Sequence, residues 1–336
     1  MPVTLKDIAA MAGVHKSTVD KVIHNRPGVS EEKRRMIRQL LDEMGYQGNA
    51  AARVMNAQKM NLRVAVVLMQ VDAAEEILCG AETMKSDYAA AGIEVELYQT
   101  PYLDVEAQLE CLRKLQGTKL SALILLPVED ARIRQAVSEL KAEGTYIITI
   151  NSDFSMEDLS DCYVGGDSRR DGSMAARMMK LFLHDGGDIL IVRNTDIYAV
   201  TARVDAFCLS LEQDKRYRIA REVDLHGAAG NLRDHIRKIK EECPGIKGLY
   251  IASGKADELC QILQEEGMSP VIICHEFYPG IRQRIGEGQI SCSVDSMLAE
   301  QGSLAMRLAY RFLVYREEPE TSENIPLSMI RIAENI

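Results

Sequence analysis

Several hydrogen-bonding side chains stand just past the ends of apolar runs in this sequence. Asn151 and Asp153 follow one such run, Glu276 follows a second, and Asp295 follows a third. If these runs are parallel strands, their carboxyl ends lie where open α/β sheets bind ligands. Carboxylates accept hydrogen bonds from hydroxyl groups and amines. The pattern therefore predicts a polar small-molecule site.

No motif for covalent or metal chemistry accompanies these residues. The sequence lacks HExxH and GxSxG, and the histidines, at positions 15, 24, 184, 226, 235 and 275, are isolated without metal-ligand spacing. The glycine-rich stretch 165–172 lacks both spacings that hold phosphates. We therefore expect no enzyme, no metal and no cofactor. An enzyme on a doubly wound fold is a rival that would need a positioned nucleophile or a cofactor fingerprint.

From residue 62 onward, apolar runs alternate with helical stretches. The runs lie at 62–69, 93–98, 120–126, 146–150, 162–165, 187–192, 218–223, 246–251, 270–274 and 290–294. The helical stretches include 72–91, 104–116, 130–143, 168–184 and 255–266. This alternation is typical of βαβ units and parallel sheets. It predicts an α/β body of two doubly wound parallel-sheet subdomains with a cleft between them, the second series of strands beginning at 162–165.

The first 55 residues predict an all-α head. Thr4 is a natural N-cap for a helix over 4–12, and Gly13 is typical of a helix end. A second helix over 15–24 and a third over 30–44 follow. Two short helices joined by a glycine-containing turn form a helix-turn-helix. The second helix leaves Lys16, Ser17, Asp20 and Lys21 on the outer face, which such helices present to the major groove.

Charge and composition agree with a head that meets a polyanion and a body that does not. Residues 1–60 hold ten basic and six acidic residues, a net charge of +4, whereas the whole chain carries −10. The eight cysteines are scattered, which favours reduced core residues. No signal peptide precedes Thr4, and no apolar run approaches ~18 residues. We expect a cytoplasmic protein with no membrane partner.

The head resembles the lactose/galactose repressor (LacI/GalR) family of bacterial transcription regulators. The residues that carry the resemblance are Val3-Thr4-Leu5-Lys6-Asp7-Ile8-Ala9, Ala12-Gly13-Val14, Ser17-Thr18-Val19, Arg26-Pro27-Gly28-Val29-Ser30 and Met44-Gly45-Tyr46. The resemblance implies a body with the type I periplasmic-binding-protein fold, whose halves exchange strands at crossovers. We expect these crossovers near 158–162, 290–294 and 318–322.

The resemblance also implies a set of DNA contacts. Lys16, Ser17 and Lys21 occupy positions that read base edges in the family, with Lys21 in place of an arginine. Non-specific phosphate contact by the two lysines is the alternative. The remaining head residues expected at the DNA are Thr4, Thr18 and His24. Asp20 replaces a serine, and it can accept from a cytosine or pair with a neighbouring lysine. Lys33, Arg34, Arg35 and Arg38 of the third helix can also reach phosphates.

Residues 46–61 read as a linker with a short helix at about 49–56. In the family this segment becomes a hinge helix in the minor groove, where an apolar side chain wedges between base pairs. Asn49, Ala52 and Met55 match the contact positions of that helix. Gly48 stands in place of proline and Met55 in place of leucine, so the free hinge is more flexible and the wedge is changed.

Further effector contacts follow from the resemblance. Arg203 matches the arginine that commonly reaches the effector in the family, and Ser253 stands where an asparagine is usual. Stacking on a sugar ring would fall to Tyr198, Phe154 or Phe277, because the chain has no tryptophan. Together with Asn151, Asp153, Glu276 and Asp295, these residues imply a sugar or sugar derivative as effector.

The sequence therefore predicts an effector-controlled transcription regulator, and the family resemblance implies that it is a repressor. Its partners would be a near-palindromic double-stranded DNA operator, a small molecule and a second copy of the chain, as a homodimer or a tetramer. The expected domains are a head over 1–45, a hinge over 46–61 and a body over 62–336. In that body the first subdomain would take about 62–160 and 295–318, and the second about 161–292 and 320–336. A solute-binding receptor of a transport system is the alternative, and inducer and corepressor actions both stay open.

Overall fold

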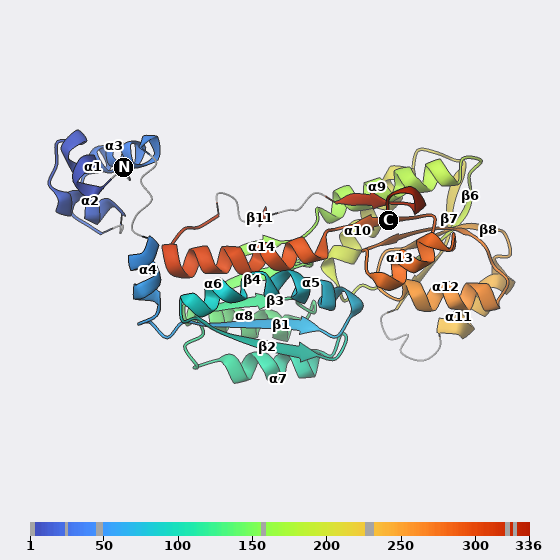
Figure 1. Ribbon diagram of the computed structural model, residues 1–336. Coiled ribbons are helices and arrows are strands. Elements are labelled where there is room, and N and C mark those ends of the chain that lie inside the picture. The colour runs from blue at the N-terminus through green and yellow to red at the C-terminus, as the bar shows by residue number, and fades with distance from the viewer. Residues whose placement is uncertain are drawn as a thin grey trace. The chain divides into compact units, whose positions relative to one another are not determined.

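The computed structural model describes residues 4–23, 26–44, 50–155, 159–225, 232–319, 323–324 and 328–336. The chain divides into two compact units, Met1–Lys59 and Met60–Ile336. The first unit contains only helices among its described residues, and the second contains two β-sheets with helices on both faces of each (Figure 1).

The first unit contains helices α1 (Leu5–Met11), α2 (Lys16–Ile23), α3 (Glu31–Glu43) and α4 (Ala50–Ala57). The first three confirm the predicted helices to within one residue at each end. Thr4 and Asp7 form a capping box, in which each side chain accepts a hydrogen bond from the backbone N–H of the other. The core consists of the buried residues Ile8, Ala9, Val19, Val22 and Ile37. Because these residues recur at helical spacing, the sequence predicts this small core well.

The first sheet of the second unit has strand order β11-β5-β4-β3-β1-β2, and its strands are parallel. The strands are β1 (Arg63–Met69), β2 (Glu94–Thr100), β3 (Ala122–Leu125), β4 (Tyr146–Ile150), β5 (Cys162–Val164) and β11 (Glu323–Asn324). Helices α7 (Val105–Leu115) and α8 (Ala131–Ala142) cover one face through a shared apolar core. On the other face, α14 (Leu298–Tyr310) packs along α5 (Asp72–Glu82).

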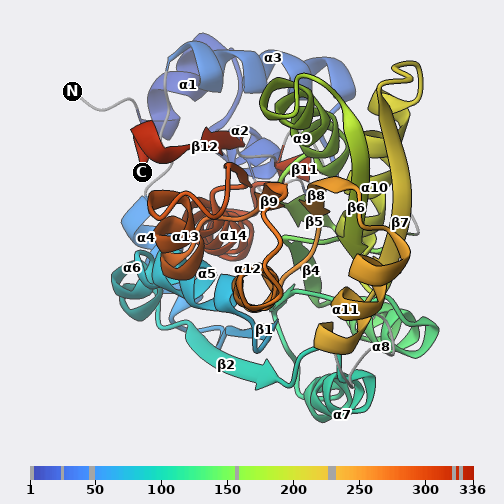
Figure 2. The same cartoon turned by 90° about the vertical axis from the view of Figure 1, so that its right-hand side faces the viewer.

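The second sheet has strand order β12-β10-β9-β8-β6-β7, and only β12 is antiparallel among its described pairings. The strands are β6 (Gly187–Arg193), β7 (Tyr217–Asp224), β8 (Ile246–Ile251), β9 (Val271–His275), β10 (Cys292–Asp295) and β12 (Met329–Arg331). Helices α9 (Ser168–Phe182) and α10 (Tyr198–Leu211) lie side by side on one face (Figure 2).

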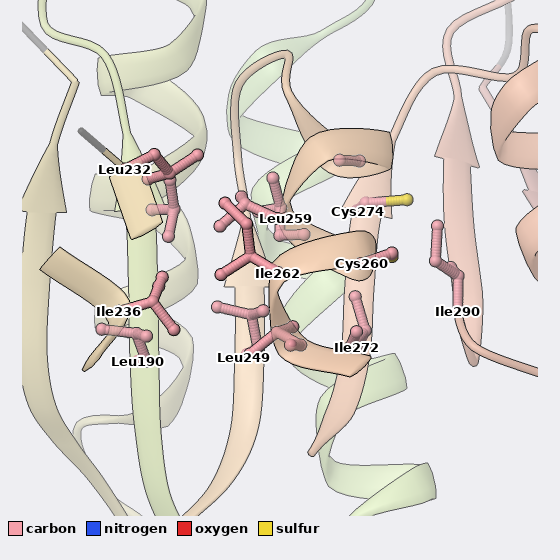
Figure 3. Close-up of a cluster of buried hydrophobic side chains, with 14 of the residues drawn as sticks. Leu190, Leu232, Ile236, Leu249, Leu259, Cys260, Ile262, Ile272, Cys274 and Ile290 are labelled. Carbon is pink, nitrogen blue, oxygen red and sulfur yellow. The ribbon is translucent and has the colours of Figure 1, made fainter. Parts of the chain in front are cut away.

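The opposite face of the second sheet carries α11 (Leu232–Glu242), α12 (Ala256–Glu265) and α13 (Pro279–Gly286). Figure 3 shows how Ile236 of α11 and Leu259 and Ile262 of α12 point toward the buried strand residues Leu190 and Leu249. Cys260 and Cys274 are buried in this core as free thiols, as the scattered cysteines predict.

The crossovers between the two sheets lie a few residues later than predicted. The run at 162–165 was expected to open the second sheet, but β5 pairs with β4 in the first, with Cys162 opposite Ile148. The chain therefore passes to the second sheet after β5, returns between β10 and α14, and crosses again between β11 and β12. A three-residue strand is too short for its pattern to indicate which sheet it joins, and β11 and β12 were not predicted.

The single helix expected at 72–91 is divided. It forms α5 and a second short helix, α6 (Lys85–Ala90), with a turn at Thr83 and Met84. The Thr83 hydroxyl donates to the carbonyl of Gly80 at 2.7 Å. Threonine hydroxyls compete with the helical ladder for such carbonyls, which accounts for the break.

Candidate functional site

A cavity of about 330 Å³ lies between the carboxyl ends of strands from both sheets of the second unit. Its walls include the apolar side chains of Met69, Val71, Leu126, Ile197 and Val200. Its polar lining residues include Asn151, Arg203, Ser253, His275 and Glu276. A cleft with apolar walls and a few convergent polar groups is the usual form of a small-molecule site.

Arg203 and Glu276 form a buried ion pair in the polar part of the cavity. The Nη2 of Arg203 donates to Oε1 of Glu276 at 3.0 Å, and their side chains are only 5% and 13% exposed. Burial opposes the charge of Arg203, but the carboxylates of Glu276 and Asp171 outweigh it, so the pKa of Arg203 is raised. Arg203 is therefore a permanent cation held at the cavity by carboxylates.

Glu276 is in turn connected to the helix that covers the first sheet. Its Oε2 accepts from the hydroxyl of Ser296, and its carbonyl accepts from the hydroxyl of Ser293. The amide of Gln301 in α14 donates to the Ser296 hydroxyl at 3.0 Å and to the Ser296 carbonyl at 2.8 Å. The cavity is thus joined by hydrogen bonds to α14, which packs against α5 in the first subdomain.

His275 adds a neutral hydrogen-bonding group to the same part of the cavity. Burial and the nearby charge of Arg203 lower its pKa well below the usual value for histidine. Its Nε2 lies 2.8 Å from the hydroxyl of Tyr250, to which no other hydrogen bond is found among the described residues. A buried phenol is satisfied when it donates its proton. Nε2 is then the acceptor, and Nδ1 carries the hydrogen.

Four buried polar atoms on lining residues have no hydrogen-bond partner within the part of the chain that the structure describes. They are the Tyr102 hydroxyl, Nδ2 of Asn151, Nε of Arg203 and Nδ1 of His275. Buried polar groups are almost always hydrogen-bonded in native proteins. These atoms therefore indicate where a ligand rich in oxygen acceptors would bind. Burial also raises the pKa of Tyr102 to about 12, so this hydroxyl is a neutral donor.

Three lining residues hold a left-handed backbone although none is glycine. The φ angles are +63° at Asn151 and +71° at Glu276, each directly past a strand end, and +77° at Lys255, the N-cap residue of α12. Such conformations cost of order 1–3 kcal/mol and gather at functional sites. Their concentration around one cavity supports its assignment as the site.

Four of the seven residues expected to contact the effector line this cavity, namely Asn151, Arg203, Ser253 and Glu276. Asp153 is instead used locally, because it accepts from the Thr149 hydroxyl at 2.8 Å and from the backbone N–H of Phe154 at 2.9 Å. Asp295 accepts from the backbone of Met297 and pairs with Arg331 at 2.8 Å.

The aromatic residues expected to stack on a sugar ring lie elsewhere. Tyr198 opens α10 and is not among the lining residues. Phe154 is buried in the core of the first subdomain, and Phe277 packs beneath the guanidinium of Arg331. The aromatic lining residues are Tyr102 and Tyr278. The search for polar residues at the ends of apolar runs could also have identified Tyr102 and His275. Tyr102 follows β2 by two residues, and His275 is the last residue of β9.

In the first unit, α2 presents the expected polar face to solvent. Lys16, Ser17 and Lys21 are exposed, and Thr18 is half-buried. His15 caps this helix, because its Nδ1 accepts from the backbone N–H of Ser17 at 3.3 Å and lies 2.9 Å from the Ser17 hydroxyl. The Ser17 hydroxyl is therefore hydrogen-bonded to His15 in this structure.

Two charged residues of the head have partners that the sequence did not indicate. Asp20 pairs with Arg26 at 3.5 Å. Arg34 is 9% exposed and donates to the carbonyl of Arg26 at 2.9 Å, so it supports the turn before α3. Of the basic residues on α3, Lys33, Arg35 and Arg38 remain exposed.

The predicted hinge helix corresponds to α4. Met55 on this helix is 58% exposed, which leaves its side chain accessible. His24, Asn49 and the side chain of Ala52 lie outside the described residues. Thr4 is exposed, with its hydroxyl in the capping box of α1.

Two protein-family models match the chain. The model for the periplasmic binding protein domain matches residues 64–317, and the model for bacterial regulatory proteins of the lacI family matches residues 4–49. Among the described residues, no helix is long and apolar enough to span a bilayer. No group of three or more potential metal ligands occurs in the same part of the chain.

Curated relatives are named as transcriptional regulators. The chain is 25% identical over 219 residues to the HTH-type transcriptional regulator TreR of Salmonella typhimurium, a match that covers 65% of each chain. It is 30% identical over 154 residues to the uncharacterized HTH-type transcriptional regulator YkvZ of Bacillus subtilis, covering 44% of each. The matched regions thus span less than two thirds of these relatives' own length.

Solved structures share the fold of the body. A solute-binding protein of an ABC transporter from Burkholderia graminis, in complex with D-arabinose, has a TM-score of 0.73 at 15% identity and covers 82% of this chain and 96% of its own. A putative LacI transcriptional regulator from Bacteroides fragilis has a TM-score of 0.73 at 16% identity, covering 82% and 98%. At this identity the likeness establishes the fold alone.

Proposed function

We propose that this chain, which belongs to the periplasmic binding protein domain family and carries a lacI-family regulatory domain, is a DNA-binding transcriptional regulator controlled by a small polyhydroxylated effector. The observation that carries the proposal is the presence of both parts in one chain. The head has the capped helix-turn-helix with exposed Lys16 and Lys21, and the body has the cavity around Arg203.

The head supports sequence-specific binding through α2. An exposed lysine on such a helix can donate to guanine O6 or N7 in the major groove. Lys16 and Lys21 are the proposed base readers, Ser17 and Thr18 support them, and Thr4 lies at a helix N-terminus suited to a phosphate. We assign Asn49, Ala52 and Met55 to the minor groove and His24 to the backbone, following the family resemblance.

The cavity supports a sugar-like effector. Its unpartnered donors at Asn151, Arg203 and His275 suit hydroxyl and ring oxygens, and Glu276 can accept from a hydroxyl. Among the described lining residues the two cations are each paired with a carboxylate, Arg203 with Glu276 and Lys255 with Glu258. A neutral polyol therefore fits this cavity better than a phosphorylated one.

Effector control requires that the ligand bind two arrangements of the body with different affinity. The cavity lies where the chain crosses between the two sheets, so a ligand contacts both subdomains at once. We propose a head over 1–45, a hinge over 46–61 and a body over 62–336 that acts as a homodimer on a near-palindromic site. Repression, with the effector as inducer or corepressor, is the proposed mode, and the protein acts in the cytoplasm as a non-enzyme.

A solute-binding receptor is the second candidate, because structures of such receptors match the body over most of their length. Selection of genomic fragments by the full chain separates the two functions. A matched double variant, Lys16→Ala with Lys21→Ala, serves as the control. We expect the natural chain to enrich a near-palindromic site at physiological salt and the variant to lose it. Equal, sequence-blind recovery by both proteins would contradict the regulator and leave the receptor.

A further inference from the structure

A second carboxylate lies behind the Arg203–Glu276 pair. Asp171, in the first turn of α9, is fully buried, and neither of its oxygens makes a hydrogen bond to a described residue within normal geometry. The hydroxyl of Ser328 favours its ionised form in part, but burial dominates and the pKa of Asp171 is raised. A buried carboxylate without a hydrogen bond of normal geometry is costly, so its retention calls for a role.

Two glycines explain how Asp171 comes to lie beside Arg203. A Cβ on Gly172 would lie 2.0 Å from the carbonyl oxygen of Arg203, so the backbones of α9 and α10 touch at this point. A Cβ on Gly166 would lie 2.7 Å from Oδ2 of Asp171 and 3.3 Å from Cβ of Ser296. Asp171 therefore lies close to Gly166, in the segment that leads from the first sheet to the second. It also lies near Ser296, whose hydroxyl donates to Glu276.

The charge of one guanidinium acts on two buried carboxylates here. Arg203 bonds to Glu276 through Nη2, while its Nε has no hydrogen bond to a described residue and the oxygens of Asp171 have none within normal geometry, Ser328 being the hydroxyl that acts on them. The remaining groups that act on Asp171 electrostatically are Glu276, Asp167, Tyr163 and Tyr250. Arg203 is the cation among the groups found to act on Asp171. The arrangement therefore has a natural alternative, in which Arg203 turns to Asp171.

We propose that Asp171 is a positioning residue that serves as the alternative partner of Arg203. In the ligand-free arrangement the guanidinium bonds to Glu276. When a ligand hydroxyl takes the place of the guanidinium at Glu276, Arg203 bonds to Asp171 and the carboxylate of Glu276 is free to accept from the ligand. This inference rests on the proposed function for its ligand, but the exchange itself is a property of the protein alone.

The change of partner at Arg203 would also affect the helices that cover the first sheet. The Ser296 hydroxyl donates to Glu276 and accepts a hydrogen bond from the side-chain amide of Gln301 in α14. Next to Gln301, a Cβ on Gly302 would lie 1.9 Å from the carbonyl oxygen of Ile77 in α5, so the two helices are in backbone contact. Any movement of Glu276 away from Arg203 is therefore transmitted along hydrogen bonds to a helix that cannot shift independently of α5.

The test is a double-mutant cycle on the full chain, without ligand or DNA. Asp171→Asn keeps the shape and removes the charge, and Glu276→Gln weakens the present partner of Arg203. In the natural background Asp171→Asn should raise the unfolding temperature of the body by roughly 2 °C or more, because it removes a buried carboxylate whose desolvation outweighs its favourable partners. In the Glu276→Gln background it should lower that temperature, because Arg203 has then turned to Asp171. Asp167→Asn, at the N-cap of the same helix, is the control and should give the same shift in both backgrounds.

A reversal of sign supports the exchange, and a merely structural role would not produce it. Equal shifts in both backgrounds would overturn the proposal, and so would destabilisation by Asp171→Asn in the natural background, because Asp171 would then already have its partner. If Glu276→Gln does not fold, Glu276→Asp, whose shorter carboxylate retracts from Arg203, takes its place with the same expected reversal. Since no DNA or ligand enters the experiment, its outcome is independent of whether the regulator assignment holds.

Discussion

The Nη2 of Arg203 lies 3.0 Å from Oε1 of Glu276, and both side chains are almost fully buried. The two residues come from different places in the second subdomain, Arg203 from α10 and Glu276 from the residue after β9. Both residues line the cavity, so the cation of Arg203 lies where a ligand would bind. Its partner Glu276 is connected through Ser296 to Gln301 of α14.

Loss of the Arg203 side chain should therefore destabilise the body as well as remove ligand binding. Arg203→Ala leaves Glu276 buried and unpaired, which costs roughly 3–5 kcal/mol in the free energy of unfolding. Urea unfolding of the full chain measures this cost. Arg132→Ala is the control, because Arg132 pairs with Asp130 at an exposed site and its loss should change little. Similar effects of the two substitutions would show that the Arg203 pair contributes no more than a surface pair.

The raised pKa of Asp171 predicts a pH-dependent difference between the natural chain and Asp171→Asn. Burial raises this pKa above the ordinary 3.8, so the group stabilises the fold while protonated. That contribution is present below the ordinary pKa and is lost as the pH rises through the raised value. The advantage of Asp171→Asn should accordingly be small near about pH 4 and grow toward about pH 8. Thermal unfolding across this range measures it, and an advantage that shrinks with rising pH would contradict a raised pKa.

Much of this architecture follows from local sequence patterns. The capping box of Thr4 and Asp7, the glycine that ends α1 and the alternating strands are all short-range signals, and the structure confirms them. The sheet partner of β5 was predicted wrongly, because three residues carry no signal about which sheet they join. Tertiary context decides such cases.

The candidate site was predictable only in part. Asn151 and Asp153 both follow β4, yet only Asn151, with its left-handed backbone, lines the cavity. Asp153 accepts from the neighbouring Phe154 amide instead, as short carboxylates near a turn commonly do. Asp171 was missed because nothing in its local sequence shows that Gly172 brings α9 against Arg203. That relationship exists only once two helices are packed.

The importance of the close contact between α9 and α10 can be tested at Gly172, the glycine that permits it. Gly172→Ala would place a Cβ 2.0 Å from the Arg203 carbonyl oxygen, so the helices must separate. Alanine gains about 1 kcal/mol over glycine in a helix, but overpacking costs typically 1–3 kcal/mol. We expect a net loss of stability in urea, together with weaker ligand binding. Gly245→Ala, at a position outside the cavity with open space around it, is the control and should be nearly neutral. A stabilised Gly172→Ala would show that the helices can part without cost.

Lys21 offers a test that separates base reading from phosphate contact. Its side chain is exposed on α2, and its Nζ lies 3.5 Å from the position of a Cβ on Gly28. Lys33 on α3 is exposed too, and we expect it to contact phosphates alone. Each substitution to alanine should reduce the dependence of log K on log salt by about 1. Only Lys21→Ala should also reduce the preference for the selected site over random DNA, by about 1–3 kcal/mol. Titrations of both DNAs at several salt concentrations measure the two quantities. An equal loss of preference from both variants, or from neither, would assign Lys21 to the phosphate backbone and leave Lys16 as the candidate base reader.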